Sequence, residues 1–218
     1  MLKKYKTILA QAEAEIVEKK SRFIATVRPV KTEEEARSFI DELKKKYWDA
    51  THNVFAYQIG ERNEIQRFSD DGEPQGTAGM PVLNVLKGED VKDTAIVVTR
   101  YFGGTLLGTG GLVRAYGKGA KEGLLAAGIA ELVLYSRYFV TVDYTDSGKV
   151  QYEILQDGHV LHDTQYTDQV QFCVLVESEQ SEAFEKKMLD IMKGKQVAEK
   201  MDEVFGVWQN ETLQLMEQ

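Results

Sequence analysis

Cysteine is nearly absent from this sequence of 218 residues, in which Cys173 is the single example. One cysteine excludes a disulfide within the chain and any metal site made of several thiolates, and it fits a reducing compartment. Long apolar runs are also missing, since stretches such as Phe172–Val176 are far shorter than the roughly 20 residues of a membrane-spanning helix. The positively charged start has no apolar segment after it, so we expect no signal peptide, no membrane partner and a cytoplasmic location.

Proline is rare as well, with 3 residues, whereas apolar residues make up 43% and charged residues 28%. This composition excludes a chain that is disordered throughout and predicts a globular protein with a real core. The length fits one large domain or two small ones.

The net charge of −8 is unevenly distributed along the chain. Residues 1–131 carry 20 Lys and Arg against 19 Asp and Glu, whereas residues 132–218 carry 7 against 16. Taken alone, the total argues against nucleic-acid partners. Because the acidity belongs to the last 87 residues, the N-terminal part is left open to a local contact with an anion.

The order of expected elements predicts two α+β domains. In the last third, strands over 132–144, 159–166, 170–176 and 197–208 and helices over 146–156 and 179–193 give the ferredoxin-like order βαββαβ, with Asp146 as N-cap of the first helix. Before it we expect strands over 6–10, 15–30, 53–59 and 95–102, helices over 32–47, 80–86 and 112–127, and a loop over 60–79. Thr32 followed by Glu35 is a capping box at the start of the first helix. We place the domains at 1–134 and 135–218.

A glycine-rich junction joins the strand over 95–102 to the helix over 112–127. Glycines allow close approach of backbone N–H groups to a ligand, and a helix N-terminus favours an anion. The segment is neither a Walker loop nor a dinucleotide fingerprint. An anion site and a tightly packed turn therefore remain equal alternatives for Gly103, Gly104, Gly108, Gly110 and Gly111.

Basic residues follow this junction on one helix face. Arg114, Lys118 and Lys121 share the face opposite the apolar stripe. A solvated helix face is the common explanation, and a short phosphate-binding ridge is the functional one. Arg22, Arg67 and Arg100, with Lys19 and Lys20, would add further phosphate contacts.

The expected 60–79 loop contains three carboxylates in a stretch of four residues. Asp70, Asp71 and Glu73, with His52 before them, would suit acid–base catalysis or a Mg²⁺ ion if they converged. Asp and Gly are also common in ordinary polar turns, which is the simpler interpretation. We therefore assign no catalytic residue, metal or cofactor, and keep these four as the alternative.

Five segments resemble one known family. They are Lys19–Phe23, Ala50–Asn53, Ser69–Gly79, Val98–Gly104 and Leu107–Tyr116, and together they are similar to the motifs of the IMPACT/YigZ family. The resemblance implies an N-terminal domain like the second domain of a small-subunit ribosomal protein, with a two-layer α/β sandwich whose helices cover one face of a four-stranded sheet. It implies a C-terminal ferredoxin-like domain similar to the last domains of translocating elongation factor. Eukaryotic members are regulators of translation, and bacterial members have no defined biochemical role.

The leading hypothesis is a translation-associated regulatory protein that contacts RNA, or a ribosomal or translation-factor surface, through its N-terminal domain. The alternative is an enzyme that acts on a phosphorylated small molecule or nucleotide, with the glycine-rich loop as its phosphate site. The sequence leaves open whether the 69–79 loop and the 103–114 junction meet in space. It also leaves open the oligomeric state.

Overall fold

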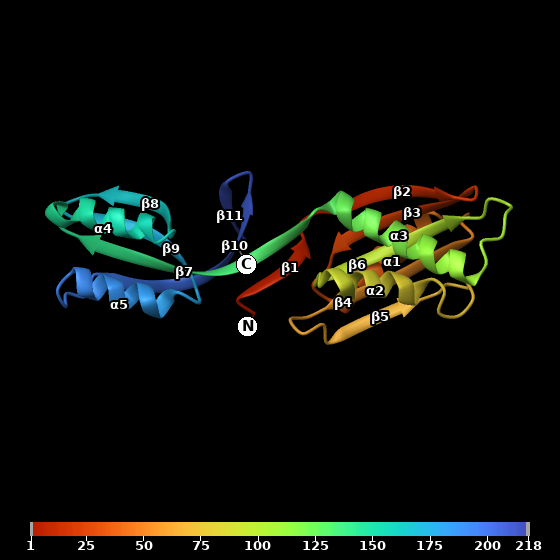
Figure 1. Cartoon of the computed structure of the whole chain (residues 1–218), viewed down its shortest axis with the longest axis horizontal. Coiled ribbons are helices and arrows are strands. Elements are labelled where there is room, and N and C mark those ends of the chain that lie inside the picture. The colour runs from red at the N-terminus through yellow and green to blue at the C-terminus, as the bar shows by residue number, and fades with distance from the viewer. Residues whose placement is uncertain (1, 217–218) are drawn as a thin grey trace. The chain divides into compact units, whose positions relative to one another are not determined.

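The structure is a computed structural model that describes residues 2–216, and the chain divides into two compact units (Figure 1). The N-terminal unit spans Tyr5–Glu131, and the C-terminal unit spans the chain from Leu132 onward together with the first residues up to Lys4. In the C-terminal unit, the N–H of Leu134 donates to the carbonyl oxygen of Lys3 at 2.8 Å. Both units combine helices with antiparallel sheets, which confirms the predicted two-domain α+β class.

The N-terminal unit is a five-stranded antiparallel sheet with helices on both faces. Its strands are in the order β2-β3-β6-β4-β5. In chain order the elements are β1 (Lys4–Ile8), β2 (Ala12–Glu18), β3 (Ser21–Pro29), α1 (Glu33–Lys46), β4 (His52–Ile59), β5 (Ile65–Ser69), α2 (Gly79–Glu89), β6 (Thr94–Tyr101) and α3 (Thr109–Ala127).

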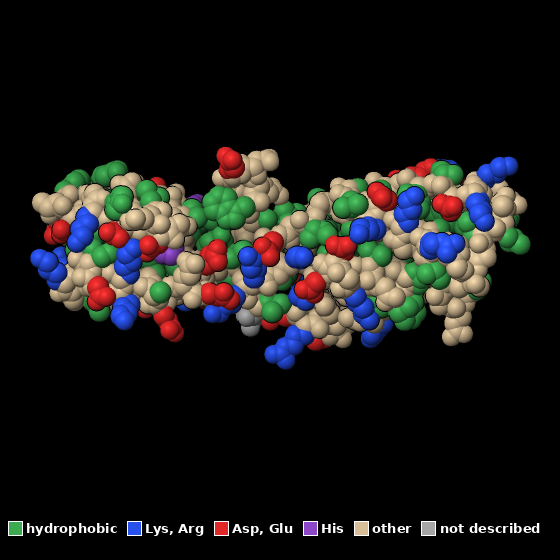
Figure 2. Space-filling model, viewed as in Figure 1, with side chains coloured by type: hydrophobic (Ala, Val, Ile, Leu, Met, Phe, Trp, Pro, Cys, Tyr) green, Lys and Arg blue, Asp and Glu red, His purple; other side chains and the backbone are tan. Residues whose placement is uncertain are grey.

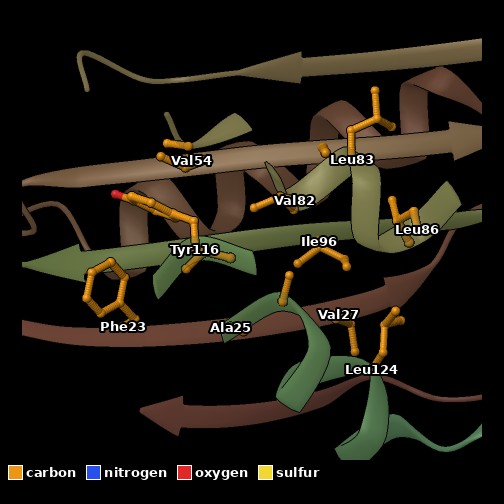
Figure 3. Packing of buried hydrophobic residues seen from close by; sticks show 14 of the residues in the cluster. Phe23, Ala25, Val27, Val54, Val82, Leu83, Leu86, Ile96, Tyr116 and Leu124 are labelled. Carbon is orange, nitrogen blue, oxygen red and sulfur yellow. The ribbon is translucent and has the colours of Figure 1, made fainter. Parts of the chain in front are cut away.

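The central strand β6 explains why its sequence is apolar without a break. Ile96 and Val98 face α2 and α3, whereas Ala95 and Val97 face α1, so both sides of the strand are buried. The resemblance implied four strands and helices on one face; the structure instead has a fifth strand and places α1 on the opposite face. Figure 3 shows the larger core, in which Tyr116 of α3 extends toward Phe23 of β3. The two rings meet edge to face with centroids 5.1 Å apart.

Several predicted elements are confirmed and others need correction. Thr32 caps α1 by accepting the N–H of Glu35 at 3.1 Å, as the capping box predicted. The strand expected over 15–30 is wrong, because β2 and β3 form a hairpin whose turn places Lys19 and Lys20 at φ of 45° and 70°. The loop expected over 60–79 contains β5, and α3 begins three residues earlier than predicted.

The C-terminal unit has the predicted βαββαβ order with one added strand. Its elements are β7 (Ile129–Val142), α4 (Tyr144–Gln156), β8 (Val160–Tyr166), β9 (Val170–Glu177), α5 (Ser181–Ile191), β10 (Ala198–Gln209) and β11 (Thr212–Met216). The strand order β11-β10-β7-β9-β8 is the ferredoxin-like arrangement with β11 added at its edge. Asp143 occupies the N-cap position of α4, so the prediction of Asp146 was wrong.

Candidate functional site

Sequence segments that lie far apart meet at one end of the N-terminal sheet. Arg100, near the end of β6, pairs with His52 of β4 on one side and with Phe23 of β3 on the other. A cavity of about 450 Å³ opens at this end. The 69–79 loop and the junction before α3 therefore meet at one place. The lining residues are Thr51, His52, Glu73, Pro74, Arg100, Phe102, Leu106, Leu107, Gly108, Thr109 and Leu112.

A buried ion pair lies beside the cavity. Arg100 Nη1 donates to Glu73 Oε1 at 2.5 Å, and the hydroxyl of Tyr116 donates to the same oxygen at 2.7 Å. Glu73 is 8% exposed and Arg100 is 5% exposed. Burial, with the Glu73 carboxylate nearby, raises the pKa of Tyr116, so this tyrosine stays a neutral donor. A buried charge needs such partners, because desolvation would otherwise cost several kcal/mol.

Arg100 is held from several sides within an otherwise apolar core. It lies on the face of β6 that also presents Ile96 and Val98 to α2 and α3. Its guanidinium carbon lies 5.4 Å from the ring centroid of Phe23, and Nη2 donates to Ser21 Oγ at 3.4 Å. Within residues 2–216, its buried Nε has no hydrogen-bond partner.

His52 is oriented by the neighbouring loop. Its Nδ1 lies 2.7 Å from the carbonyl oxygen of Asp71, which can only accept, so Nδ1 carries the hydrogen. Nε2 lies 3.8 Å from Glu73 Oε1, and both residues line the cavity. In the neutral ring this nitrogen is a hydrogen-bond acceptor.

The three carboxylates of the 69–79 loop do not converge. Asp70 accepts the N–H groups of Gly76, Ala78 and Gly79, which ties the loop to the start of α2. Asp71 pairs with Lys44 at 2.9 Å and accepts the N–H of Asn53 at 2.6 Å. Glu73 alone of the three lines the cavity. No group of three or more acidic, histidine or cysteine side chains in the described part of the chain could hold a metal.

The glycines of the junction serve two purposes. Gly103 is a tight packing position, since a Cβ there would lie 2.0 Å from the carbonyl carbon of Lys20. Gly104 and Gly108 adopt φ of 80° and 69°, which suits glycine. Gly110 and Gly111 lie in the first turn of α3, whose earliest N–H groups have no partner within the helix. Thr109, at that start, lines the cavity.

The predicted basic residues fall into two classes. Four are in ion pairs: Arg22 with Glu15, Arg67 with Glu33, Arg100 with Glu73 and Lys121 with Glu89. The other four are exposed and have no ion pair among residues 2–216: Lys19, Lys20, Arg114 and Lys118. On the face of the N-terminal unit seen in Figure 2, basic and acidic side chains are interspersed.

Three of the four unpaired cations lie near residues that line the cavity, and Lys118 lies one turn further along α3. The hairpin turn that carries Lys19 and Lys20 packs against Gly103, next to the rim residue Phe102. Arg114 follows Leu112 by two residues in α3, and its guanidinium lies near Gly110. Ser21, Phe102, Leu106 and the hydroxyl of Tyr116 also lie at this site and were not predicted as site residues. The sequence signal that could have indicated Phe102 is an aromatic residue directly before a pair of glycines.

Comparisons with known proteins agree with the two units. The Impact N-terminal domain matches residues 19–124, and a domain of unknown function, DUF1949, matches residues 140–195. IMPACT family member YvyE of Bacillus subtilis is 47% identical over 195 residues, which are 89% of this chain and 90% of that protein. The chain belongs to the IMPACT family. IMPACT family member YigZ of Escherichia coli is 34% identical, covering 86% of this chain and 94% of that protein.

A solved structure has a similar fold along nearly the whole chain. It is described as the crystal structure of a hypothetical protein and is 29% identical. The match covers 93% of this chain and 99% of that one, with a TM-score of 0.59. Within residues 2–216, no helix is long and apolar enough to cross a membrane.

Proposed function

We propose that this protein is a translation-associated regulatory protein that contacts RNA through its N-terminal unit. The observation that carries the proposal is the position of three unpaired cations near one cavity, with Lys19 and Lys20 on the hairpin beside Gly103 and Arg114 at the start of α3. Membership of the IMPACT family supports the setting, because the resemblance to that family implies a role in the regulation of translation.

The contact would be local rather than a broad electrostatic grip. The N-terminal part has nearly balanced charge, and half of its predicted phosphate-binding residues are already in ion pairs. A few lysines and arginines position a nucleic-acid backbone without reading its sequence. The N–H groups at the start of α3 would add to this contact.

The test is a salt titration of single-stranded RNA binding by the full chain. Each lost phosphate contact flattens the slope of log affinity against log salt by about 0.7 for single strands. We expect Arg114→Ala and Lys20→Ala each to weaken binding and to flatten the slope by about this amount. Lys186→Ala is the matched control, because Lys186 is an exposed lysine in the C-terminal unit. Binding that ignores salt and all of these substitutions would refute the RNA contact.

A second candidate is an enzyme that acts on a phosphorylated small molecule or nucleotide. The specific observation in its favour is that His52 and Glu73 line the same cavity as Thr109 at the start of α3. Its test is a thermal-shift screen with phosphorylated metabolites, with and without Mg²⁺, followed by product analysis for each ligand that stabilises. A specific ligand at about 100 times its dissociation constant adds roughly 2.7 kcal/mol of stability. A ligand that stabilises the protein but is not converted to product would refute the enzyme and indicate a binding protein.

A further inference from the structure

We propose that the cavity receives one unpaired nucleobase, guanine in preference to uracil, with its N–H edge toward Glu73 and its ring against Phe102. This inference rests on the proposed contact with nucleic acid and names what the cavity adds to it. Sequence-selective proteins commonly bind unstacked bases in this way, by hydrogen bonds to the base edge and stacking on aromatic rings.

The size and lining of the cavity fit a planar, mostly apolar ligand. Its volume of about 450 Å³ lies in the range of small-ligand sites. Leu107, Leu112 and Pro74 contribute apolar walls, and the polar groups are few. At the rim, Phe102 is 47% exposed and Leu106 is 83% exposed, so two large apolar side chains are open to a ligand.

Glu73 offers a hydrogen-bond acceptor to that ligand. Arg100, Tyr116 and His52 all approach its Oε1 atom. No hydrogen bond or ion pair to Oε2 is found among residues 2–216, although Glu73 is more than nine-tenths buried and lines the cavity. Oε2 is not among the fully buried polar atoms that lack a partner, so solvent reaches it and a ligand N–H can donate to it.

The charges beside the cavity select a neutral donor. Arg100 already balances Glu73, so a ligand ammonium would add an unpaired positive charge beside a buried guanidinium. A ligand carboxylate or phosphate would instead meet Glu73 Oε2 directly. The N–H groups of a nucleobase are neutral donors and avoid both penalties.

A second acceptor distinguishes between the bases. His52 Nε2 lies 3.8 Å from Glu73 Oε1, and His52 lines the cavity with Glu73. Guanine presents adjacent ring N–H and amino donors, which match two neighbouring acceptors. Uracil presents a single N–H between two carbonyl oxygens, which would face the acceptors of Glu73 and His52.

The phosphate of the same nucleotide would meet positive groups just outside the cavity. Thr109 at the start of α3 lines the cavity, and α3 is long enough to have a helix dipole. Lys19 and Lys20 lie beyond Phe102, on the hairpin that packs against Gly103. The base and the backbone of one nucleotide thus find different partners.

The experiment measures binding of the full chain by calorimetry to guanosine monophosphate, uridine monophosphate and ribose 5-phosphate. We expect guanosine monophosphate to bind at least tenfold tighter than the other two. Phe102→Ala should weaken it about tenfold through lost stacking. Tyr152→Ala, an exposed aromatic residue of the C-terminal unit, is the control and should have no effect. In Glu73→Gln the amide is a donor where Oε2 accepted, so the preference for guanine should fall or reverse.

A second arm compares hexauridine RNA with the same hexamer carrying one central guanosine. Tighter binding of the hexamer that carries guanosine, with the salt slope expected for phosphate contacts, supports recognition of a guanine base within RNA. If only the mononucleotides are bound selectively, the result supports the cavity site and refutes the RNA contact. Salt-dependent RNA binding that is equal for both hexamers overturns the base site and leaves the proposed function standing. Binding of ribose 5-phosphate as tight as that of guanosine monophosphate also overturns the base site. If Glu73→Gln does not fold, Phe102→Ala decides.

Discussion

Glu73 Oε1 lies 2.5 Å from Arg100 Nη1, and both side chains are withdrawn from solvent. This pair joins the 69–79 loop to the end of the central strand, and Tyr116 joins it to α3. Three segments that border the cavity are therefore linked through one carboxylate oxygen.

Breaking this pair should destabilise the N-terminal unit strongly. Arg100→Met leaves Glu73 buried without its cation, and we expect a loss of about 3–5 kcal/mol in the free energy of unfolding. Urea denaturation measures it. Arg22→Met is the control, because the Arg22–Glu15 pair is about half exposed and should contribute far less to the free energy of unfolding. Equal losses in the two variants would show that burial does not govern the pair.

Asp70→Ala should loosen the start of α2. The carboxylate accepts the N–H groups of Ala78 and Gly79, and the N-cap residue Ala78 has no side chain that could replace it. We expect a loss of about 1–2 kcal/mol and faster hydrogen exchange at these two amides. Asp41→Ala, at an exposed position of α1, should change neither. Unchanged exchange at Ala78 and Gly79 would contradict the capping role.

Two glycine substitutions should have opposite signs. Gly103→Ala places a Cβ 2.0 Å from the carbonyl carbon of Lys20, so the β2–β3 turn must move, and we expect a loss of about 1–3 kcal/mol. Gly117→Ala meets nothing within 4 Å inside α3 and should stabilise by about 0.5–1 kcal/mol. Thermal or urea unfolding measures both. A stabilising Gly103→Ala would mean that the hairpin does not pack there.

The C-terminal unit should lose stability as the pH falls from about 7 to 5. Burial against Phe184 lowers the pKa of His159 below its usual value. The charge of Lys187 also lowers this pKa, whereas Asp157 and Glu177 raise it by less than burial lowers it. The unfolded chain, with a histidine pKa near 6.5, then binds more protons than the folded chain in this range. Stability is therefore present above the unfolded pKa and declines below it.

The variant His159→Gln isolates this contribution. It should flatten the dependence of unfolding free energy on pH between 7 and 5, whereas His162→Gln, at an exposed position, should leave it unchanged. An equally steep dependence in His159→Gln would assign the effect to another group.

Elements with a recognisable local pattern were predictable from the sequence, and those without one were not. Thr32 and Glu35 predict the start of α1, because the two residues of the capping box lie within four positions of the sequence. The β2–β3 turn was missed because two lysines, rather than glycine or asparagine, adopt positive φ there. β5 was missed because a short edge strand in a turn-rich segment has little pattern of its own.

The candidate site illustrates the same limit. His52 and Glu73 were grouped in one alternative site and Arg100 was placed among the phosphate contacts, but no spacing indicates that Glu73 and Arg100, 27 apart in the sequence, form a buried pair. The role of Asp71 was equally hidden, because its partners, Lys44 and the N–H of Asn53, lie in other segments. The glycine-rich junction was recognised, and the structure divides its residues between packing and the start of α3.

The bond between Lys3 and Leu134 has a consequence for how this protein is made. The C-terminal unit is discontinuous in sequence, since it takes its first residues from the beginning of the chain and the rest from Leu132 onward. During synthesis the ribosome releases Lys3 early, but its partner strand emerges only after the whole N-terminal unit has been translated. The N-terminal unit can therefore fold first, and Lys3 pairs with Leu134 only after that strand has been made.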